Sequence, residues 1–259
     1  MATHTNTYVM GRGRLYFDPF DANDATTGER YLGNTPGFEL TIESEVVEHF
    51  NADSGVREKD DSVTIEVNRN ATITCDNISN ENLALFIIGD VSTVSQTGAS
   101  VTDEAITVQT GRYYQLGVSS SNPTGRRGIS TVVVQDDTDT TTYVEDTDYE
   151  VDATLGRLYI IPGGSIADDD VLHVDYAYAT NSRTQIASNS TQSTDGALRY
   201  VADNAKGTNR DLYIPSCELR PEGGFQMKTE NEWQALGFAI EFNKKDTSTE
   251  QLYIDGRAA

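Results

Sequence analysis

Apolar and polar residues alternate along two long stretches, and this is the clearest pattern in the chain. In residues 38–50 and again in residues 63–75, most second positions are apolar and the residues between them are mostly glutamate, threonine or asparagine; Ser44 and Glu48 interrupt the apolar row. A period of two indicates β-strands with one apolar and one polar face. We therefore predict a long hairpin whose tip is the polar loop 51–62. The apolar positions are Phe38, Leu40, Ile42, Val46, Phe50, Val63, Ile65, Val67, Ala71, Ile73 and Cys75.

The predicted hairpin has consequences for self-association. Each strand is about twice the usual ~5–6 residues, and no proline interrupts either one. A long two-stranded hairpin is only marginally stable alone, and its unpaired edges invite further strands. One way to satisfy such edges is to pair them with neighbouring copies until a barrel closes.

Residues 102–180 are predicted to form a separate, inserted unit. Short strand candidates recur there between turn residues, and the segment is rich in carboxylates and contains no lysine. Many short strands at close spacing favour a small β-sandwich, immunoglobulin-like in architecture although it lacks the paired cysteines of antibody domains. The strand candidates are residues 113–118, 129–135, 142–145, 149–151, 157–161 and 171–178.

The remaining residues, 1–100 and 181–259, are predicted to form one split core domain. Its polar stretches 90–101 and 181–197 have the composition of linkers. Ser79 can cap a short helix over residues 80–88 that ends at Gly89. The fold class predicted is therefore mostly β, with a single short helix, a long hairpin and an inserted β-sandwich.

Composition narrows the possible partners. The 259 residues carry a formal net charge of −22, which excludes nucleic-acid binding by charge neutralisation and disfavours an anionic membrane. The Thr-rich N-terminus lacks the features of a signal peptide, and no apolar run reaches the ~18 residues of a membrane span. The two cysteines, Cys75 and Cys217, are predicted to be buried reduced thiols; a single structural disulfide is the alternative.

No catalytic, cofactor-binding or metal-binding motif is recognisable, so we predict a protein that is not an enzyme and needs no cofactor. His4, His49 and His173 lack the partners and spacing of a zinc site, and surface roles are expected for them. The acidic runs 136–139 and 168–170 lack the glycine and terminal glutamate of an EF-hand. Solvated turn acids are the favoured interpretation, with calcium ligands as the alternative.

A binding module is the rival class of function. A surface adhesin or carbohydrate-binding β module commonly presents an exposed aromatic platform. Tyr113 with Tyr114, and Tyr176 with Tyr178, are the candidates for such a platform.

Several stretches resemble the tail tube (major tail) protein of long flexible-tailed bacteriophages, the siphophages. The resemblance covers the split core and does not extend over residues 102–180. It is carried by Gly11-Arg12-Gly13-Arg14-Leu15-Tyr16-Phe17, Gly28-Glu29-Arg30-Tyr31-Leu32-Gly33-Asn34, the acidic alternating strand, Arg57-Glu58-Lys59-Asp60-Asp61, Cys75-Asp76-Asn77-Ile78, Leu83-Ala84-Leu85-Phe86, Leu212-Tyr213-Ile214-Pro215, Gly223-Gly224 and Glu232-Trp233-Gln234-Ala235-Leu236.

The resemblance implies a structural role in the virion tail, after assembly in the host cytoplasm. Copies would form hexameric rings whose hairpins join into one barrel, and the rings would stack into a tube that conducts DNA without binding it. Partners would be the tail tip or baseplate, the tail terminator and the tape measure protein in the lumen, while immunoglobulin-like insertions commonly decorate the outside. The expected lumen-facing residues are Glu39, Glu43, Glu45, Glu66 and Glu241, and the expected inter-ring contacts are Gly55, Arg57, Glu58, Lys59, Asp60 and Asp61.

Overall fold

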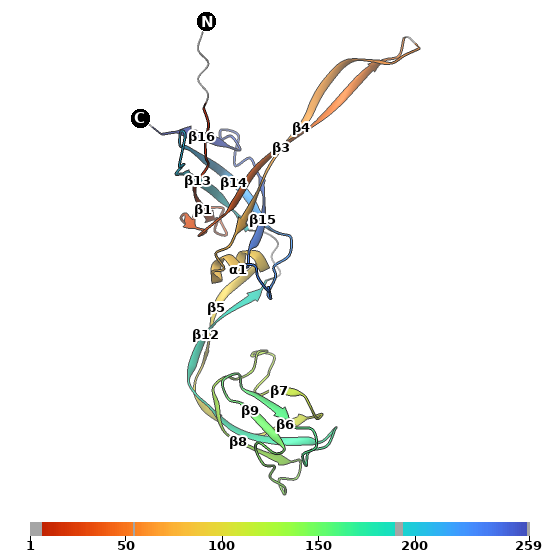
Figure 1. Ribbon diagram of the computed structural model, residues 1–259, viewed down its shortest axis with the longest axis vertical. Helices are drawn as coiled ribbons and strands as arrows, with labels where there is room; N and C mark the ends of the chain where they lie inside the picture. Colours follow the sequence, from red (N-terminus) through yellow and green to blue (C-terminus); the bar gives the residue numbers. More distant parts are fainter. Residues whose placement is uncertain (1–6, 54, 190–193, 258–259) are drawn as a thin grey trace. The chain divides into compact units, whose positions relative to one another are not determined.

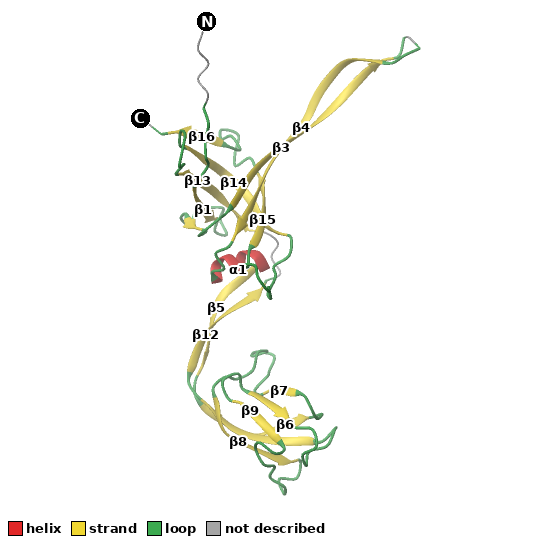
Figure 2. Ribbon diagram, viewed as in Figure 1, coloured by secondary structure: helices red, strands yellow, loops and turns green. Residues whose placement is uncertain are grey.

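The computed structural model describes residues 7–53, 55–189 and 194–257 and is mostly β, as predicted, with one short helix (Figure 2). The chain forms two compact units. The larger comprises Met1–Val91 and Ile186–Ala259, and the smaller comprises Ser92–Gln185. The boundaries expected from sequence, near residues 101 and 181, fall inside the smaller unit. No helix in the described part of the chain is long and apolar enough to cross a membrane.

One eight-stranded sheet organises the larger unit. Its order is β2-β1-β13-β14-β15-β4-β3, β16 pairs with β14 outside this path, and all of these pairings are antiparallel. The strands are β1 (Gly13–Pro19), β2 (Arg30–Tyr31), β3 (Gly37–Asn51), β4 (Glu58–Cys75), β13 (Thr194–Ala202), β14 (Arg210–Glu222), β15 (Leu236–Phe242) and β16 (Tyr253–Gly256).

A single apolar core lies against this sheet. Buried side chains from β1, β4, β13, β14 and β15 form one cluster, and Phe38 and Leu40 of β3 pack on it. The rings of Phe38 and Tyr200 lie 5.7 Å apart, so the edge strand β3 comes close to β13 on the other side of the core. The sheet therefore curls around its own apolar face.

Helix α1 (Asn80–Ile87) covers part of this core. The Ser79 side chain accepts a hydrogen bond from the Asn82 backbone N–H, which confirms the predicted cap. The C-terminal prediction is wrong in one respect: Ile88, with φ of 51°, takes the left-handed position in place of Gly89. A Cβ on Gly89 would meet the Ala187 carbonyl at 2.4 Å, so this glycine serves a close approach of two backbones.

The two predicted linkers are β-strands. β5 (Gly89–Gln96) and β12 (Asn181–Ser188) pair with each other in a two-stranded sheet. They carry the chain out of the larger unit and back into it. Most of their side chains are exposed or half-buried, so neither strand shows the apolar alternation that reveals a half-buried strand.

The smaller unit holds two three-stranded sheets around a common core. Their orders are β7-β10-β9 and β6-β11-β8, and both supply side chains to one buried cluster. Residues 142–145, expected as a strand, form only two isolated bridges, at Thr142 and Glu145, while the polar strand β6 was not predicted. An immunoglobulin-like topology stays a prediction. The strands are β6 (Ala99–Thr107), β7 (Tyr113–Gln115), β8 (Ile129–Asp136), β9 (Tyr149–Asp152), β10 (Arg157–Ile160) and β11 (Val171–Tyr178).

Both cysteines are buried free thiols, as predicted, and the disulfide alternative is wrong. Burial raises the pKa of Cys75 and raises that of Cys217 to about 12. Because the thiolate is the reactive form, these side chains serve as small apolar core residues.

Candidate functional site

The outer half of the β3–β4 hairpin is paired only with itself. β15 bonds to β4 from Asn70 to Cys75, so β4 residues 58–69 have β3 as their only strand partner in the described structure. β3 is the last strand of the sheet. The hairpin extends away from the rest of the larger unit (Figure 1). We call residues 42–51 with 58–69 the distal ribbon; both of its edges lack a strand partner.

The tip of the hairpin is shorter than predicted. β3 continues to Asn51 and β4 begins at Glu58, so four expected tip residues, Glu58, Lys59, Asp60 and Asp61, are strand residues. Side-chain contacts between the strands allow this: the Lys59 Nζ lies 2.6 Å from Glu48 Oε1 in an ion pair, and the His49 Nδ1 lies at hydrogen-bonding distance, 2.5 Å, from Asp60 Oδ1. Such cross-strand pairs stabilise a sheet without apolar alternation.

Gly55 and Arg57 stay in the connecting loop. The Arg57 guanidinium lies over the Phe50 ring, 5.3 Å from its centroid. The charged side chains near the end of the hairpin therefore have partners within the hairpin itself.

Large apolar side chains are exposed along the distal ribbon. Ile42, Val63 and Ile65 are each between 57 and 58% exposed, although the same alternation places Ile73 in the core at 1%. Apolar side chains in this number on a two-stranded ribbon are typical of a surface that is covered in an assembly. The full set is Ile42, Val46, Val47, Phe50, Val63, Ile65 and Val67, with Val56 in the loop.

The five glutamates singled out from sequence share one face of the sheet. Directly paired residues of antiparallel strands point to the same side. Glu45 faces Glu66 across the β3–β4 pair, and Glu43 lies two positions before Glu45 on the same strand. Glu39 pairs with Thr72, which in turn pairs with Ala239, two positions before Glu241 on β15. All five are exposed.

The acidic face extends further than the sequence analysis suggested. Glu218 on β14 pairs with Glu241, and Arg220 bridges the two carboxylates, lying 3.6 Å from Glu241 Oε2. Glu218 and Arg220 alternate with buried Cys217 and Leu219, so a period-two reading of β14 could have found them. The positive charge of Arg220 partly offsets the negative charge of Glu218 and Glu241 where β14 and β15 pair.

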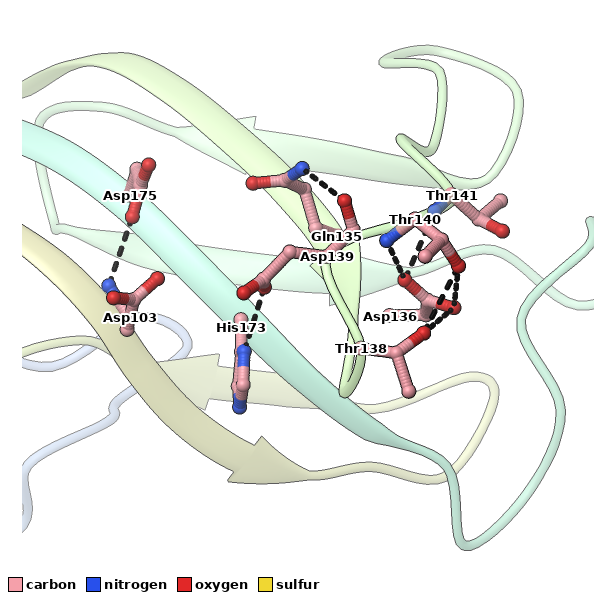
Figure 3. A network of polar contacts seen from close by, with 9 residues as sticks. All are labelled: Asp103, Gln135, Asp136, Thr138, Asp139, Thr140, Thr141, His173 and Asp175. Atoms are coloured by element: carbon pink, nitrogen blue, oxygen red, sulfur yellow. Dashed lines mark hydrogen bonds and ion pairs between the residues drawn. The ribbon is translucent and has the colours of Figure 1, made fainter.

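Asp136 and Asp139, from the acidic run 136–139, belong to a network of polar contacts in the smaller unit (Figure 3). The Asp136 carboxylate accepts hydrogen bonds from Thr138, Thr140 and Thr141, and the Thr141 backbone bond is the main reason its pKa falls to about 2. Asp168 likewise accepts two bonds from Thr110. These carboxylates hold turns, in agreement with the favoured interpretation.

Asp103, Asp139 and His173 are the one set of possible metal ligands found among the described residues. Their ligand atoms lie within 4.8 Å of one another. His173 Nδ1 and Asp139 Oδ1 lie 2.7 Å apart, and Asp103 is fixed separately by its backbone N–H, which donates to Asp175 Oδ1 at 2.8 Å (Figure 3). An ion pair and a backbone bond explain the arrangement without a metal.

We expect the pKa of His173 to exceed its ordinary value near 6.5 in the folded protein. Its hydrogen bond to Asp139 is the main cause of the raised pKa. The stability that protonated His173 contributes to the fold is fully present below the unfolded-state pKa. It is lost as the pH rises through the higher folded-state pKa. Titration of the His173 ring by NMR measures the value, and Asp139→Asn should lower it. A ring that titrates identically in wild type and Asp139→Asn contradicts the pairing.

The tyrosines proposed as an aromatic platform do not share one surface. Tyr176 is 2% exposed and donates to Glu104 at 2.5 Å, which removes it from any platform. Tyr178 lies under the Arg126 guanidinium, 4.5 Å from it. Tyr113 is exposed, but its ring is tilted by 38° against Tyr159. His4 lies outside the described residues.

The geometry defines a class: a mostly-β protein of two compact units whose most distinctive surface is an uncovered, two-faced ribbon. The chain belongs to the family described as "Protein of unknown function UCP028589", which matches residues 8–221. The match includes the smaller unit, the distal ribbon and the larger unit as far as Pro221 in β14. No curated protein matches the chain.

Proposed function

We propose that the protein is a structural subunit that self-assembles through its hairpin into rings and then a hollow tube, as the major tail protein of a siphophage. The observation that carries the proposal is the distal ribbon, with two unpaired edges and exposed apolar side chains. The ribbon of a second copy can supply a strand partner for a free edge and an apolar surface to cover the exposed side chains, since strand edges pair with strand edges. Repetition around a ring leaves no free edge, because a closed barrel has none.

The acidic face supports a tube with an acidic lumen. Glu39, Glu43, Glu45, Glu66 and Glu241 lie on one side of the continuous β3–β4–β15 surface. In a barrel built from these strands, one side faces the channel and the other faces the rest of the protein. The side of β3 and β4 that carries Phe38, Leu40 and Ile73 packs on the core, so the acidic side is the one available to the channel. Carboxylates there repel the phosphates of a passing duplex and keep it from adhering.

The residues assigned to ring stacking fit this scheme after the correction to the hairpin tip. Gly55 and Arg57 are at the end of the hairpin, and Glu58, Lys59, Asp60 and Asp61 begin β4. The contacts with the tail tip or baseplate, terminator and tape measure protein, and the virion localisation, rest on the family resemblance. The smaller unit would serve as a decoration of the tube.

Electron microscopy of the purified protein tests the proposal. Negative-stain images should show rings or hollow tubes once the protein is concentrated, or when a tail-tip nucleus is added. Particles that remain single subunits under both conditions contradict it. A glycan array provides the control for the binding-module alternative, which predicts specific hits from dispersed subunits.

A further inference from the structure

Trp233 is the most exposed large apolar side chain in the described structure. It is 95% exposed on the loop between β14 and β15, residues 223–235, which we call the Trp233 loop. Met227 on the same loop is 76% exposed. Isolated exposed apolar residues are ordinary, but an indole and a thioether presented together on one loop resemble the anchors of protein interfaces. Such anchors usually insert into a pocket of the partner.

The larger unit also contains a half-open hollow of about 730 Å³ whose lining is part apolar and part polar. Its walls include Leu15, Phe38, Tyr200, Leu212 and Ile254, and Arg12 and Arg210 are also part of the lining. We call it the Arg12/Arg210 hollow. Its volume is within the range of cavities that hold compact ligands, so an indole fits with room for neighbouring side chains.

Charge distinguishes this hollow from the rest of the surface. The chain has 41 acidic residues against 19 Lys and Arg, yet the lining contains two arginines and no carboxylate. Neither the Arg12 nor the Arg210 guanidinium forms an ion pair with any described residue. An occupant with carboxylates beside an apolar group would match both properties of the hollow.

The Trp233 loop has that composition. Glu230 and Glu232 come three and one positions before Trp233, and both are exposed. Neither carboxylate is ion-paired within the described residues, and Lys228 is the third charged residue of the loop. A side chain that is 95% exposed fills no cavity in its own chain. A Trp233 side chain placed in the hollow would therefore belong to another copy.

We infer that the Trp233 loop of one copy inserts into the Arg12/Arg210 hollow of the next, with Glu230 and Glu232 facing the two arginines. Loop and hollow are different surfaces, so the contact is head-to-tail and repeats from copy to copy. Such a contact generates closed rings or open filaments. This inference deepens the proposed function, on which it rests, by identifying a contact between subunits separate from the distal ribbon.

Trp233 is the only tryptophan in the sequence, so its fluorescence reports directly on this contact. We expect its emission to shift to shorter wavelength as the protein assembles, because the indole leaves water. Arg210→Glu and Glu232→Arg should each weaken the concentration-dependent shift by at least tenfold in midpoint. The double variant Arg210→Glu/Glu232→Arg should restore much of it, which a general loss of folding cannot do.

The outcomes separate this contact from the tube proposal. Assembled rings or tubes in which Trp233 still emits as a solvent-exposed indole overturn the contact and leave the tube intact. Single subunits at every concentration, with no shift even beside a tail-tip nucleus, overturn both. A shift that appears in wild type and is unchanged in both single variants places Trp233 in a different pocket and also overturns the inference.

Discussion

Replacing Ile42, Val46 and Val67 by threonine together is expected to abolish self-assembly while leaving the subunit folded, because all three lie on the face of the ribbon opposite the glutamates. The three side chains are 57, 43 and 39% exposed in the single chain, so the fold loses little when they become polar. Threonine is β-branched and keeps the preference for a strand. In an assembly that covers the ribbon, each new hydroxyl costs roughly 1–3 kcal/mol unless it finds a hydrogen bond. Three of them should raise the assembly concentration by at least about a hundredfold.

Sedimentation velocity and electron microscopy measure that concentration, and circular dichroism checks the fold. Val144→Thr is the matched control, because Val144 is 59% exposed but lies in the smaller unit away from the hairpin. It should assemble at the wild-type concentration. If the triple variant does so as well, the apolar residues of the distal ribbon face solvent in the assembled state and the proposed barrel is wrong.

Phe238→Ala is expected to destabilise the larger unit by roughly 3–5 kcal/mol, the usual cost of a phenylalanine-sized cavity in a core. Phe238 on β15 is 1% exposed and packs edge-on against Phe86 of α1, with ring centroids 6.1 Å apart. Its loss leaves a void between the sheet and the helix. A deletion of this size exceeds a third of the stability of many domains.

Hydrogen exchange read by mass spectrometry can measure the effect separately in each unit of dispersed subunits. Amides of β14 and β15 should lose protection, while those of β8 and β11 in the smaller unit should keep it. Phe50→Ala is the matched control: the same substitution at a ring that is 36% exposed should cost less than about 1 kcal/mol, including its contact with Arg57. Equal protection loss in the two variants would show that Phe238 does not anchor the core.

Sequence alone predicted the parts of the fold in which one face of a strand meets a core. The period-two pattern located β3 and β4, and with them Glu39, Glu43, Glu45 and Glu66, because a half-buried strand must alternate. It could not distinguish Ile65 from Ile73, which occupy equivalent apolar positions on β4 but are 57% and 1% exposed. Burial depends on whether other strands reach that far along the hairpin, and β15 ends its pairing at Asn70.

The features missed from sequence have no apolar periodicity. β5 and β12 expose most of both faces, so nothing but backbone pairing identifies them as strands. The first residues of β4 are held to β3 by the Lys59–Glu48 ion pair and the His49–Asp60 hydrogen bond, and their composition is that of a loop. Trp233 was seen only as part of a resemblance, since exposure of a single indole on a loop leaves no pattern in the surrounding sequence.

The pairing of β5 with β12 has a consequence for the entropy of the chain. An insertion between two strands normally separates chain ends that folding must bring together again, at a cost that grows with the length of the loop. Here the two strands that leave and re-enter the larger unit are neighbours in one sheet, and the Asn189 backbone N–H reaches back to the Ile88 carbonyl at 2.9 Å. Once the smaller unit has folded and β5 has paired with β12, the two points where the chain leaves and re-enters the larger unit are already neighbours, as they would be in a hairpin. The size of the insertion therefore adds almost nothing to the loop-closure entropy of the unit that carries it.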